Sequence, residues 1–233
     1  MKLFVDTASL SEVEKCLAAG ICDGVTNNPT INLAAGIGTK SEMKQRSIEI
    51  AELIHPRPLC VEVTTDEPSE MVRQAREYHS WSDNIVVKIT ITTREGTSCL
   101  PVIHELYKEG IEVNATAMMT LNQAFLAAKA GAKYLSLFGG RIDDEGADAV
   151  QVIGETRTWL DLWGADCPNS PEIIVGSSRT TKNISDWALT GAHILTITPA
   201  IIDKLLVNAR TKETVTQFIE DAARALSNTK KRS

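Results

Sequence analysis

Eight short runs rich in β-branched residues alternate along this chain with segments that carry helix signals. A strand followed by a helix, repeated eight times within 233 residues, predicts an α/β fold, a single-domain (β/α)8 (TIM) barrel. We expect strands over residues 2–7, 24–28, 59–64, 85–90, 111–116, 133–138, 172–177 and 193–198.

A doubly wound sheet is the main alternative, but it usually has five or six strands and a glycine-rich phosphate turn after the first. Here that turn reads Asp6-Thr7-Ala8-Ser9. The segment 36–41 also departs from a P-loop, because Thr39 stands where the second glycine belongs. We therefore expect an ordinary loop there.

Helix signals follow each strand. Ser9 and Glu12 predict a capping box that opens a helix ending at Gly20. The chain 1–233 is predicted to be one domain with an amphipathic C-terminal helix at about 212–226 and a short basic tail, Lys230-Lys231-Arg232. The other helices are expected at 41–55, 68–80, 94–109, 120–130, 147–163, 181–190 and 199–207.

Composition excludes several classes of protein. The formal net charge of −6 disfavours a nucleic-acid partner, which needs clustered Lys and Arg. No apolar run reaches the roughly 20 residues of a membrane span, and no export signal is visible, so we expect a cytoplasmic protein without a membrane partner. The five cysteines lack metal-ligand spacing, which predicts buried free thiols and no metal site.

The alternation within strands predicts which side chains face the barrel interior. In residues 85–91 every second position, starting from Ile85, is apolar and should pack on helices, so Lys88 points inward. The same alternation in residues 59–64 predicts that Glu62 points inward. The polar side chains expected near the carboxyl ends of the strands are Asp6, Asn28, Glu62, Lys88, Asn114, Ser136 and Ser177, with Thr26, Thr116 and Phe138 on the same inward faces.

A buried Lys or Glu is costly unless it is paired or used. One inward lysine with its partner could be purely structural, whereas a ring of polar groups at the carboxyl ends of barrel strands favours an active site. Arg141 and Arg179 follow the sixth and seventh strands, and Gly139-Gly140 lets backbone N–H groups approach an anion. A phosphorylated substrate is favoured; the alternative is surface arginines paired with Asp143 or Asp144.

The inward groups predict a type of chemistry. An amine in a partly apolar barrel is favoured in its neutral, nucleophilic form, and its characteristic reaction is Schiff-base formation with a carbonyl. One carboxylate can shuttle the protons of that step and a second can take the hydroxyl proton in a retro-aldol cleavage. No histidine is expected inward at a strand end, so metal-dependent aldol chemistry is disfavoured and no cofactor is predicted.

Several motifs in order resemble the transaldolases, in particular their short subfamily, which also includes fructose-6-phosphate aldolases. The motifs are FVDTA at 4–8, GVTNNPT at 24–30, VVKI at 86–89, LNQA and AAKAGA at 121–124 and 127–132, and SLFGGRIDD at 136–144. They cover nearly the whole chain. The resemblance implies a homo-oligomer, a pentamer or decamer, whose C-terminal helix contacts an adjacent subunit.

The resemblance also implies a role for each site residue. Lys88 would form the Schiff base with the keto carbon of a ketose phosphate, and Asp6 would act on the C4 hydroxyl. The remaining implied roles are a proton-relaying water held by Glu62 and Thr116, contacts to the dihydroxyacetone unit from Asn28 and Asn114, contacts to hydroxyls from Ser136 and Ser177, and phosphate binding by Arg141 and Arg179.

Glu62 and Phe138 match the transaldolase pattern, whereas aldolase members of the subfamily carry Gln and Tyr there. The chain departs from the family's usual residues at Asn27, Thr90, Leu137, Gly139, Ser178 and Thr181. The first expectation is therefore a transaldolase that uses fructose 6-phosphate or sedoheptulose 7-phosphate. The alternatives are a fructose-6-phosphate aldolase, an enzyme of a specialised pathway with an unusual aldose phosphate acceptor, and a silent barrel that only binds sugar phosphates.

Overall fold

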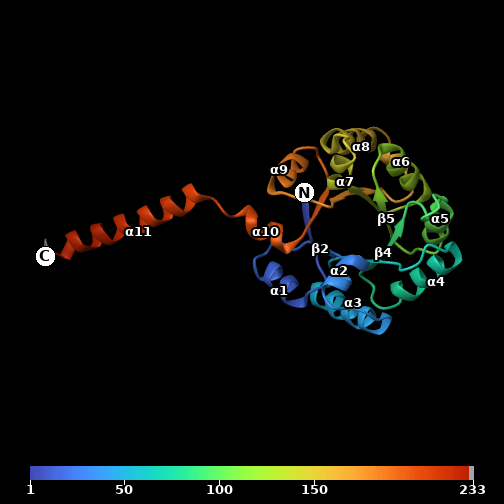
Figure 1. The fold of residues 1–233 in the computed structure, drawn as a ribbon, viewed down its shortest axis with the longest axis horizontal. Helices are drawn as coiled ribbons and strands as arrows, with labels where there is room; N and C mark the ends of the chain where they lie inside the picture. Colours follow the sequence, from blue (N-terminus) through green and yellow to red (C-terminus); the bar gives the residue numbers. More distant parts are fainter. Residues whose placement is uncertain (231–233) are drawn as a thin grey trace. The chain divides into compact units, whose positions relative to one another are not determined.

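Eight parallel strands close into a barrel in the order β1 to β8 (Figure 1). The computed structural model describes the backbone of residues 1–230 and the side chains of residues 1–226. The predicted barrel is therefore confirmed. The strands are β1 (Lys2–Asp6), β2 (Gly24–Thr26), β3 (Leu59–Glu62), β4 (Ile85–Thr90), β5 (Val113–Met118), β6 (Tyr134–Phe138), β7 (Glu172–Gly176) and β8 (Ile194–Ile197).

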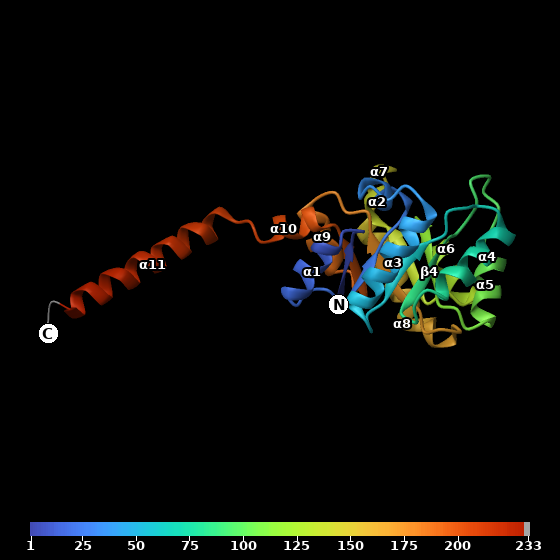
Figure 2. The same ribbon diagram turned by 90° about the horizontal axis from the view of Figure 1, so that it is seen from below.

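Helices surround the barrel, as the views down and across it show (Figures 1 and 2). They cover the outward apolar faces of the strands, whose side chains, such as Val87 and Ile89, are fully buried. The helices of the compact unit formed by residues 1–199 are α1 (Leu10–Ala18), α2 (Pro29–Ala34), α3 (Lys40–Ile54), α4 (Pro68–His79), α5 (Leu100–Lys108), α6 (Leu121–Ala130), α7 (Gly139–Asp144), α8 (Ala149–Trp163) and α9 (Thr181–Ala188).

Residues from Ala200 onward form a second compact unit. It contains most of α10 (Pro199–Leu205) and α11 (Ala209–Lys230), which extends the predicted C-terminal helix at both ends. The apolar side chains of Val215, Phe218 and Ile219 are each more than half exposed. Residues 231–232 of the predicted basic tail lie outside the described part of the chain.

An apolar layer fills the lower part of the barrel interior. In six strands, an inward apolar side chain lies two residues before a position that is level with the predicted polar ring. The apolar layer and the polar ring are therefore one pleat apart. The rings of Phe4 and Tyr134 meet edge to face with centroids 6.2 Å apart. This layer closes the amino-terminal end beneath the polar ring, and it consists of Phe4, Cys60, Val86, Tyr134, Ile174 and Ile194.

Two local predictions were wrong. Ser9 does lie at the N-cap of α1, but its side chain makes no capping hydrogen bond and instead contacts Ser11 Oγ at 3.1 Å, while Glu12 accepts a hydrogen bond from Thr7 Oγ1. The helix predicted over 94–109 begins only at Leu100, since the preceding residues fold back through a bridge between Thr92 and Ser98. The short helices α2 and α7 were not predicted, and each follows directly from the end of a strand segment.

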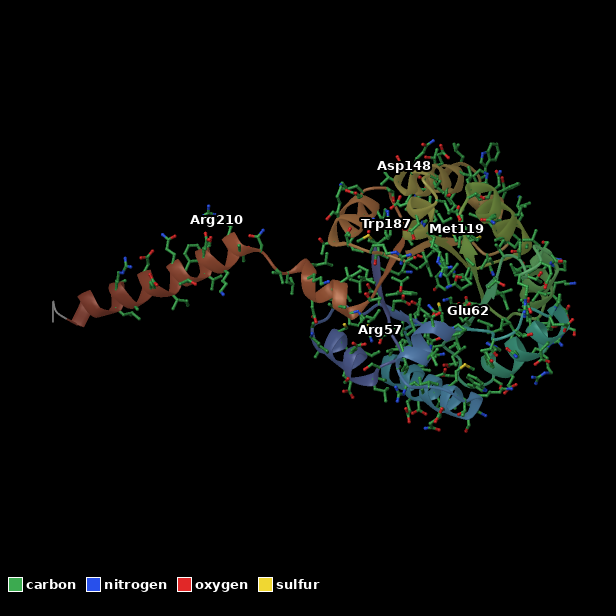
Figure 3. All side chains as sticks on the ribbon, in the orientation of Figure 1. Arg57, Glu62, Met119, Asp148, Trp187 and Arg210 are labelled. Atoms are coloured by element: carbon green, nitrogen blue, oxygen red, sulfur yellow. The ribbon has the colours of Figure 1, made fainter. Side chains whose placement is uncertain are left out.

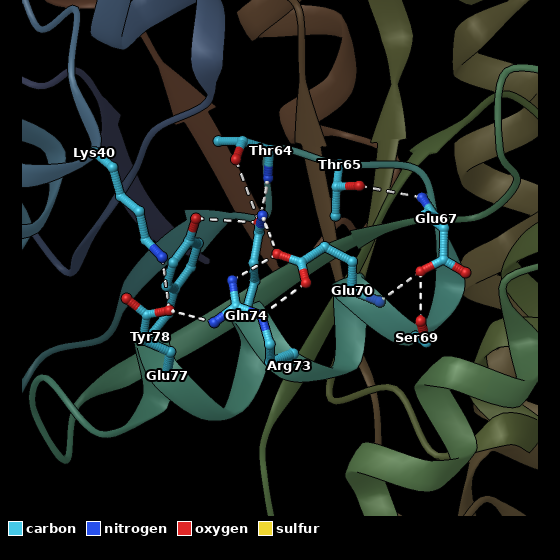
Figure 4. A network of polar contacts seen from close by, with 10 residues as sticks. All are labelled: Lys40, Thr64, Thr65, Glu67, Ser69, Glu70, Arg73, Gln74, Glu77 and Tyr78. Atoms are coloured by element: carbon cyan, nitrogen blue, oxygen red, sulfur yellow. Dashed lines mark hydrogen bonds and ion pairs between the residues drawn. The ribbon is translucent and has the colours of Figure 1, made fainter.

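A polar network on α4 holds the chain just after β3 (Figure 4). The Gln74 side-chain oxygen accepts hydrogen bonds from the Thr64 backbone N–H at 2.8 Å and from the Tyr78 hydroxyl at 3.2 Å. Thr64 is exposed because β3 ends at Glu62, two residues before the end of the predicted strand 59–64. The end of the strand that carries Glu62 is thereby anchored from outside.

Candidate active site

A cavity of about 450 Å³ opens at the carboxyl ends of the strands. Figure 3 labels Glu62 inside the ring of helices. The predicted residues that line this cavity are Asp6, Thr26, Asn28, Glu62, Lys88, Ser136, Phe138, Arg141, Ser177 and Arg179. The other two, Asn114 and Thr116, are fully buried within β5.

Lys88 lies in the cavity with its side chain 5% exposed. Its ammonium nitrogen is 3.0 Å from Glu62 Oε2 and donates a hydrogen bond of 2.9 Å to the backbone carbonyl of Asn27. Parallel pairing puts Glu62 and Lys88 in register on neighbouring strands, which brings the two side chains together. The partly open carboxylate can therefore exchange a proton with the lysine while compensating its buried charge.

Strand β5, which pairs with the strand of Lys88, carries two polar residues at inward positions. Asn114 is in register with Lys88 across β4 and β5, and its side-chain oxygen accepts a 2.8 Å hydrogen bond from Ser136 Oγ. The amide nitrogen of Asn114 and the hydroxyl oxygen of Thr116 are buried without a hydrogen-bond partner. These two buried polar atoms of β5 therefore have hydrogen-bonding capacity that no other protein group fills.

Asp6 ends β1 and faces its neighbour on β2. Thr26 Oγ1 donates a 2.6 Å hydrogen bond to Asp6 Oδ1, and the two residues are in register. Burial raises the pKa of the Asp6 carboxyl above its usual 3.8, a rise that Lys88 and Thr26 oppose and that Glu62 adds to. A carboxyl group poised in this way can accept and return a proton.

Asn28 serves two purposes at the start of α2. Its side-chain oxygen accepts a 2.9 Å hydrogen bond from the Ile31 backbone N–H and so caps the helix. Pro29 occupies the first turn, where its missing N–H costs nothing. The capping bond orients the Asn28 side chain, whose amide nitrogen remains a donor at the cavity wall.

The two arginines lie at the cavity rim in different settings. Arg141 packs its guanidinium over the Phe138 ring, with Cζ 4.9 Å from the ring centroid. Arg179 Nη2 lies 3.0 Å from Asp144 Oδ2, the carboxylate pairing considered as an alternative, and about half of its side chain is exposed. Because such an exposed pair is weak, an incoming phosphate can compete with Asp144 for this arginine.

Close backbone packing shapes the rim between β6 and β7. A side chain at Gly140 would meet the backbone carbonyl of Ser177, and a Cβ at Gly139 would lie 2.5 Å from the indole ring of Trp187. Ser177 itself has φ +66°, a left-handed conformation that is uncommon outside glycine. The rim is therefore built around two glycines and one strained serine next to the cavity.

Other cavity residues escaped the site prediction. They include Thr196 at 9% exposure, whose inward direction could have been read from the outward apolar pair Leu195 and Ile197. Ser178 lies on a loop, where alternation carries no signal. The full additional set is Pro29, Thr30, Ile31, Thr90, Ala117, Gly176, Ser178, Thr196 and Thr198.

Across the described side chains, no group of three or more His, Cys, Asp or Glu is arranged to hold a metal ion. None of the described helices has the length and apolarity that a membrane crossing requires.

A wider groove of about 710 Å³ between α6, α8 and α9 has Glu155 and Asp186 but no Lys or Arg in its lining, so it does not suit a phosphate.

The chain matches one known family over nearly its whole length. The family described as "Transaldolase/Fructose-6-phosphate aldolase" matches residues 3–233. Curated proteins named "Probable transaldolase" from Streptococcus pyogenes serotype M5 (strain Manfredo) and serotype M49 (strain NZ131) are 39% identical over 223 residues, which covers 96% of this chain and 98% of each relative.

Solved structures resemble the chain in fold alone. A cube-shaped, highly porous protein cage designed by fusing symmetric oligomeric domains has a TM-score of 0.59 at 16% identity, covering 100% of this chain and 81% of that one. Thiamine phosphate pyrophosphorylase from Pyrococcus furiosus has a TM-score of 0.58 at 15% identity, covering 84% of this chain and 85% of that one.

Proposed function

This chain belongs to the transaldolase/fructose-6-phosphate aldolase family, and from this premise we propose that it is a transaldolase that transfers a dihydroxyacetone unit through a Schiff base on Lys88. The observation that carries the proposal is the contact of a buried lysine with Glu62 at 3.0 Å, in a cavity that also holds Asp6. The donor is a ketose phosphate and the acceptor an aldose phosphate.

The first step joins the ketose to the enzyme. Glu62 takes a proton from the Lys88 ammonium, and the freed amine attacks the C2 carbonyl to form a carbinolamine. Loss of water, with the proton supplied through Glu62, leaves a protonated imine. A water molecule between Glu62 and the unpartnered Thr116 hydroxyl would carry these protons.

The second step breaks and remakes a carbon–carbon bond. Asp6 removes the proton of the C4 hydroxyl, the C3–C4 bond breaks, and its electrons flow into the imine to give an enamine. The first aldose phosphate leaves. The enamine carbon then attacks the carbonyl of the acceptor, Asp6 returns the proton, and hydrolysis of the new imine releases the product and Lys88.

The remaining residues hold the substrate. The amide groups of Asn28 and Asn114 and the hydroxyls of Ser136 and Ser177 suit the hydroxyls of the dihydroxyacetone unit. The guanidinium groups of Arg141 and Arg179 suit the phosphate at the far end of the sugar. Stacking on Phe138 supports the Arg141 guanidinium in a fixed plane.

A transferase and an aldolase of this family differ in their need for an acceptor. We expect turnover of fructose 6-phosphate to depend on an added aldose phosphate, because Glu62 and Phe138 match the transferase pattern. The measurement is the amount of product formed from fructose 6-phosphate in the presence of each of a panel of aldose phosphates, compared with the amount formed when no aldose phosphate is added. Acceptor-independent release of dihydroxyacetone would instead make the enzyme an aldolase, and preference for one unusual acceptor would indicate a specialised pathway.

The matched control for this assay is unphosphorylated fructose with the same acceptors. Its KM should be higher by roughly tenfold or more, because charge-assisted hydrogen bonds to the arginines are lost. Equal KM values for the two donors would contradict the phosphate assignment while leaving the carbon–carbon chemistry intact.

We also propose that the enzyme is a homo-oligomer, a pentamer or decamer, in which α11 contacts an adjacent subunit. The exposed apolar side chains of Val215, Phe218 and Ile219 support a protein contact along this helix. Light scattering of the full chain after gel filtration should give at least five times the chain mass of 25.4 kDa. A monomer mass would disprove the assembly.

A further inference from the structure

A chain of two hydroxyl groups reaches Asp6 from the neighbouring strands. Thr26 Oγ1 donates to Asp6 Oδ1 at 2.6 Å and also lies 2.5 Å from Thr196 Oγ1. Thr26 is 2% exposed and Thr196 is 9% exposed. Because β1 pairs with β2 on one side and with β8 on the other, the barrel itself brings these three side chains together.

The direction of the hydrogen bonds follows from counting protons. A threonine hydroxyl carries one hydrogen, and an ionised carboxylate carries none. When Asp6 is ionised, the Thr26 hydrogen must point at Asp6, so the contact between the two threonines is a hydrogen bond donated by Thr196. That donation polarises the Thr26 hydroxyl and strengthens its bond to the carboxylate.

Resting on the proposed function, in which Asp6 accepts the C4 hydroxyl proton, we propose that Thr196 is a positioning residue that acts through Thr26 to orient Asp6 and to stabilise its ionised form. The need for such support is visible in the surroundings. Burial opposes ionisation of Asp6, and the two charged groups that face it, Lys88 and Glu62, act in opposite directions. The two threonines supply neutral hydrogen bonds at the same carboxylate.

The test compares Thr196→Val with Thr196→Ser. Valine keeps the branched shape, including the methyl group that approaches Gly176, and removes only the hydroxyl; serine keeps the hydroxyl. We expect Thr196→Val to lower kcat about three- to tenfold and to move the acidic limb of the kcat–pH profile up by roughly half a unit to one unit. Thr196→Ser should restore most of both.

A double substitution tests the route through Thr26. If Thr196 acts only through Thr26, then Thr196→Val should add no further shift to a Thr26→Val protein. Additive shifts would overturn the proposed route, and an unchanged profile in Thr196→Val alone would overturn the role of Thr196.

A measurement without substrate separates this inference from the proposed function. The titration of Asp6 can be followed by carboxyl infrared or carbon NMR signals, identified by their loss in Asp6→Asn. Thr196→Val should raise the midpoint of that titration, and an unmoved midpoint would refute the inference. Absence of acceptor-dependent turnover in the native enzyme would refute the proposed function instead, with no bearing on the midpoint.

Discussion

Lys88→Met is expected to abolish transaldolase turnover, with a loss of more than about 10⁴-fold in kcat. Methionine keeps an unbranched apolar side chain in the barrel but has no amine to attack a carbonyl. The measurement that isolates this effect is borohydride trapping with fructose 6-phosphate, followed by intact mass. The native enzyme should gain one reduced adduct, either of the whole sugar phosphate or of the dihydroxyacetone unit left after cleavage, and the variant none.

Controls distinguish lost chemistry from lost folding. Removing the ammonium leaves the Glu62 carboxylate unpaired and 16% exposed, which destabilises the fold. A Lys88→Met/Glu62→Gln protein removes both charges, so it should regain stability yet stay inactive. Lys182→Met, which changes a lysine paired with Asp186 on the surface, should keep full activity. An adduct that persists in Lys88→Met would show that another amine reacts.

Asp6→Asn is expected to lower kcat by about 10²- to 10⁴-fold, the range for loss of a positioned general base. Asparagine can still accept the hydrogen bond from Thr26 but cannot take the C4 proton. Because imine formation precedes this proton transfer, borohydride should still trap an adduct on Lys88. The two substitutions therefore separate the steps, and loss of trapping in Asp6→Asn would contradict the assignment.

Stability supplies the folding control for Asp6→Asn. Because the pKa of Asp6 is raised in the folded protein, the folded state binds more protons than the unfolded state at pH values from the unfolded pKa, near 3.8, up to the raised pKa. The free energy of unfolding therefore falls as the pH rises through that window. Asparagine removes this penalty, so its melting temperature should exceed that of the native enzyme at pH 7 by more than at pH 3.

The barrel and most of the cavity could be predicted because both follow from strand alternation. Lys88 and Glu62 are the only charged residues in their strand segments at inward positions, and parallel pairing then sets them side by side. Val86 and Cys60, which lie two residues earlier in the same strands, also point inward and belong to the apolar layer. Such period-two patterns predict the structure correctly because each strand packs one face on the helices and turns the other face to the barrel interior.

The predictions that failed depend on the residue at which a strand ends and on which of several neighbours a side chain hydrogen-bonds to. Thr64 has inward parity, yet β3 ends before it and Gln74 holds its backbone. Glu12 has the spacing of a capping residue, yet Thr7 provides a closer partner. The pairing of Arg179 with Asp144, 35 positions apart, was expected only as an alternative, because no local pattern decides between a carboxylate and a phosphate as the partner.

The packing of Trp187 against Gly139 also limits which residues position 139 can accept. The resemblance to the family implies an aliphatic residue at position 139, and the space its side chain would need is filled by an indole that is 1% exposed. A residue with a side chain at position 139 therefore requires the indole of Trp187 to move, so the residues tolerated at 139 depend on the residue at 187.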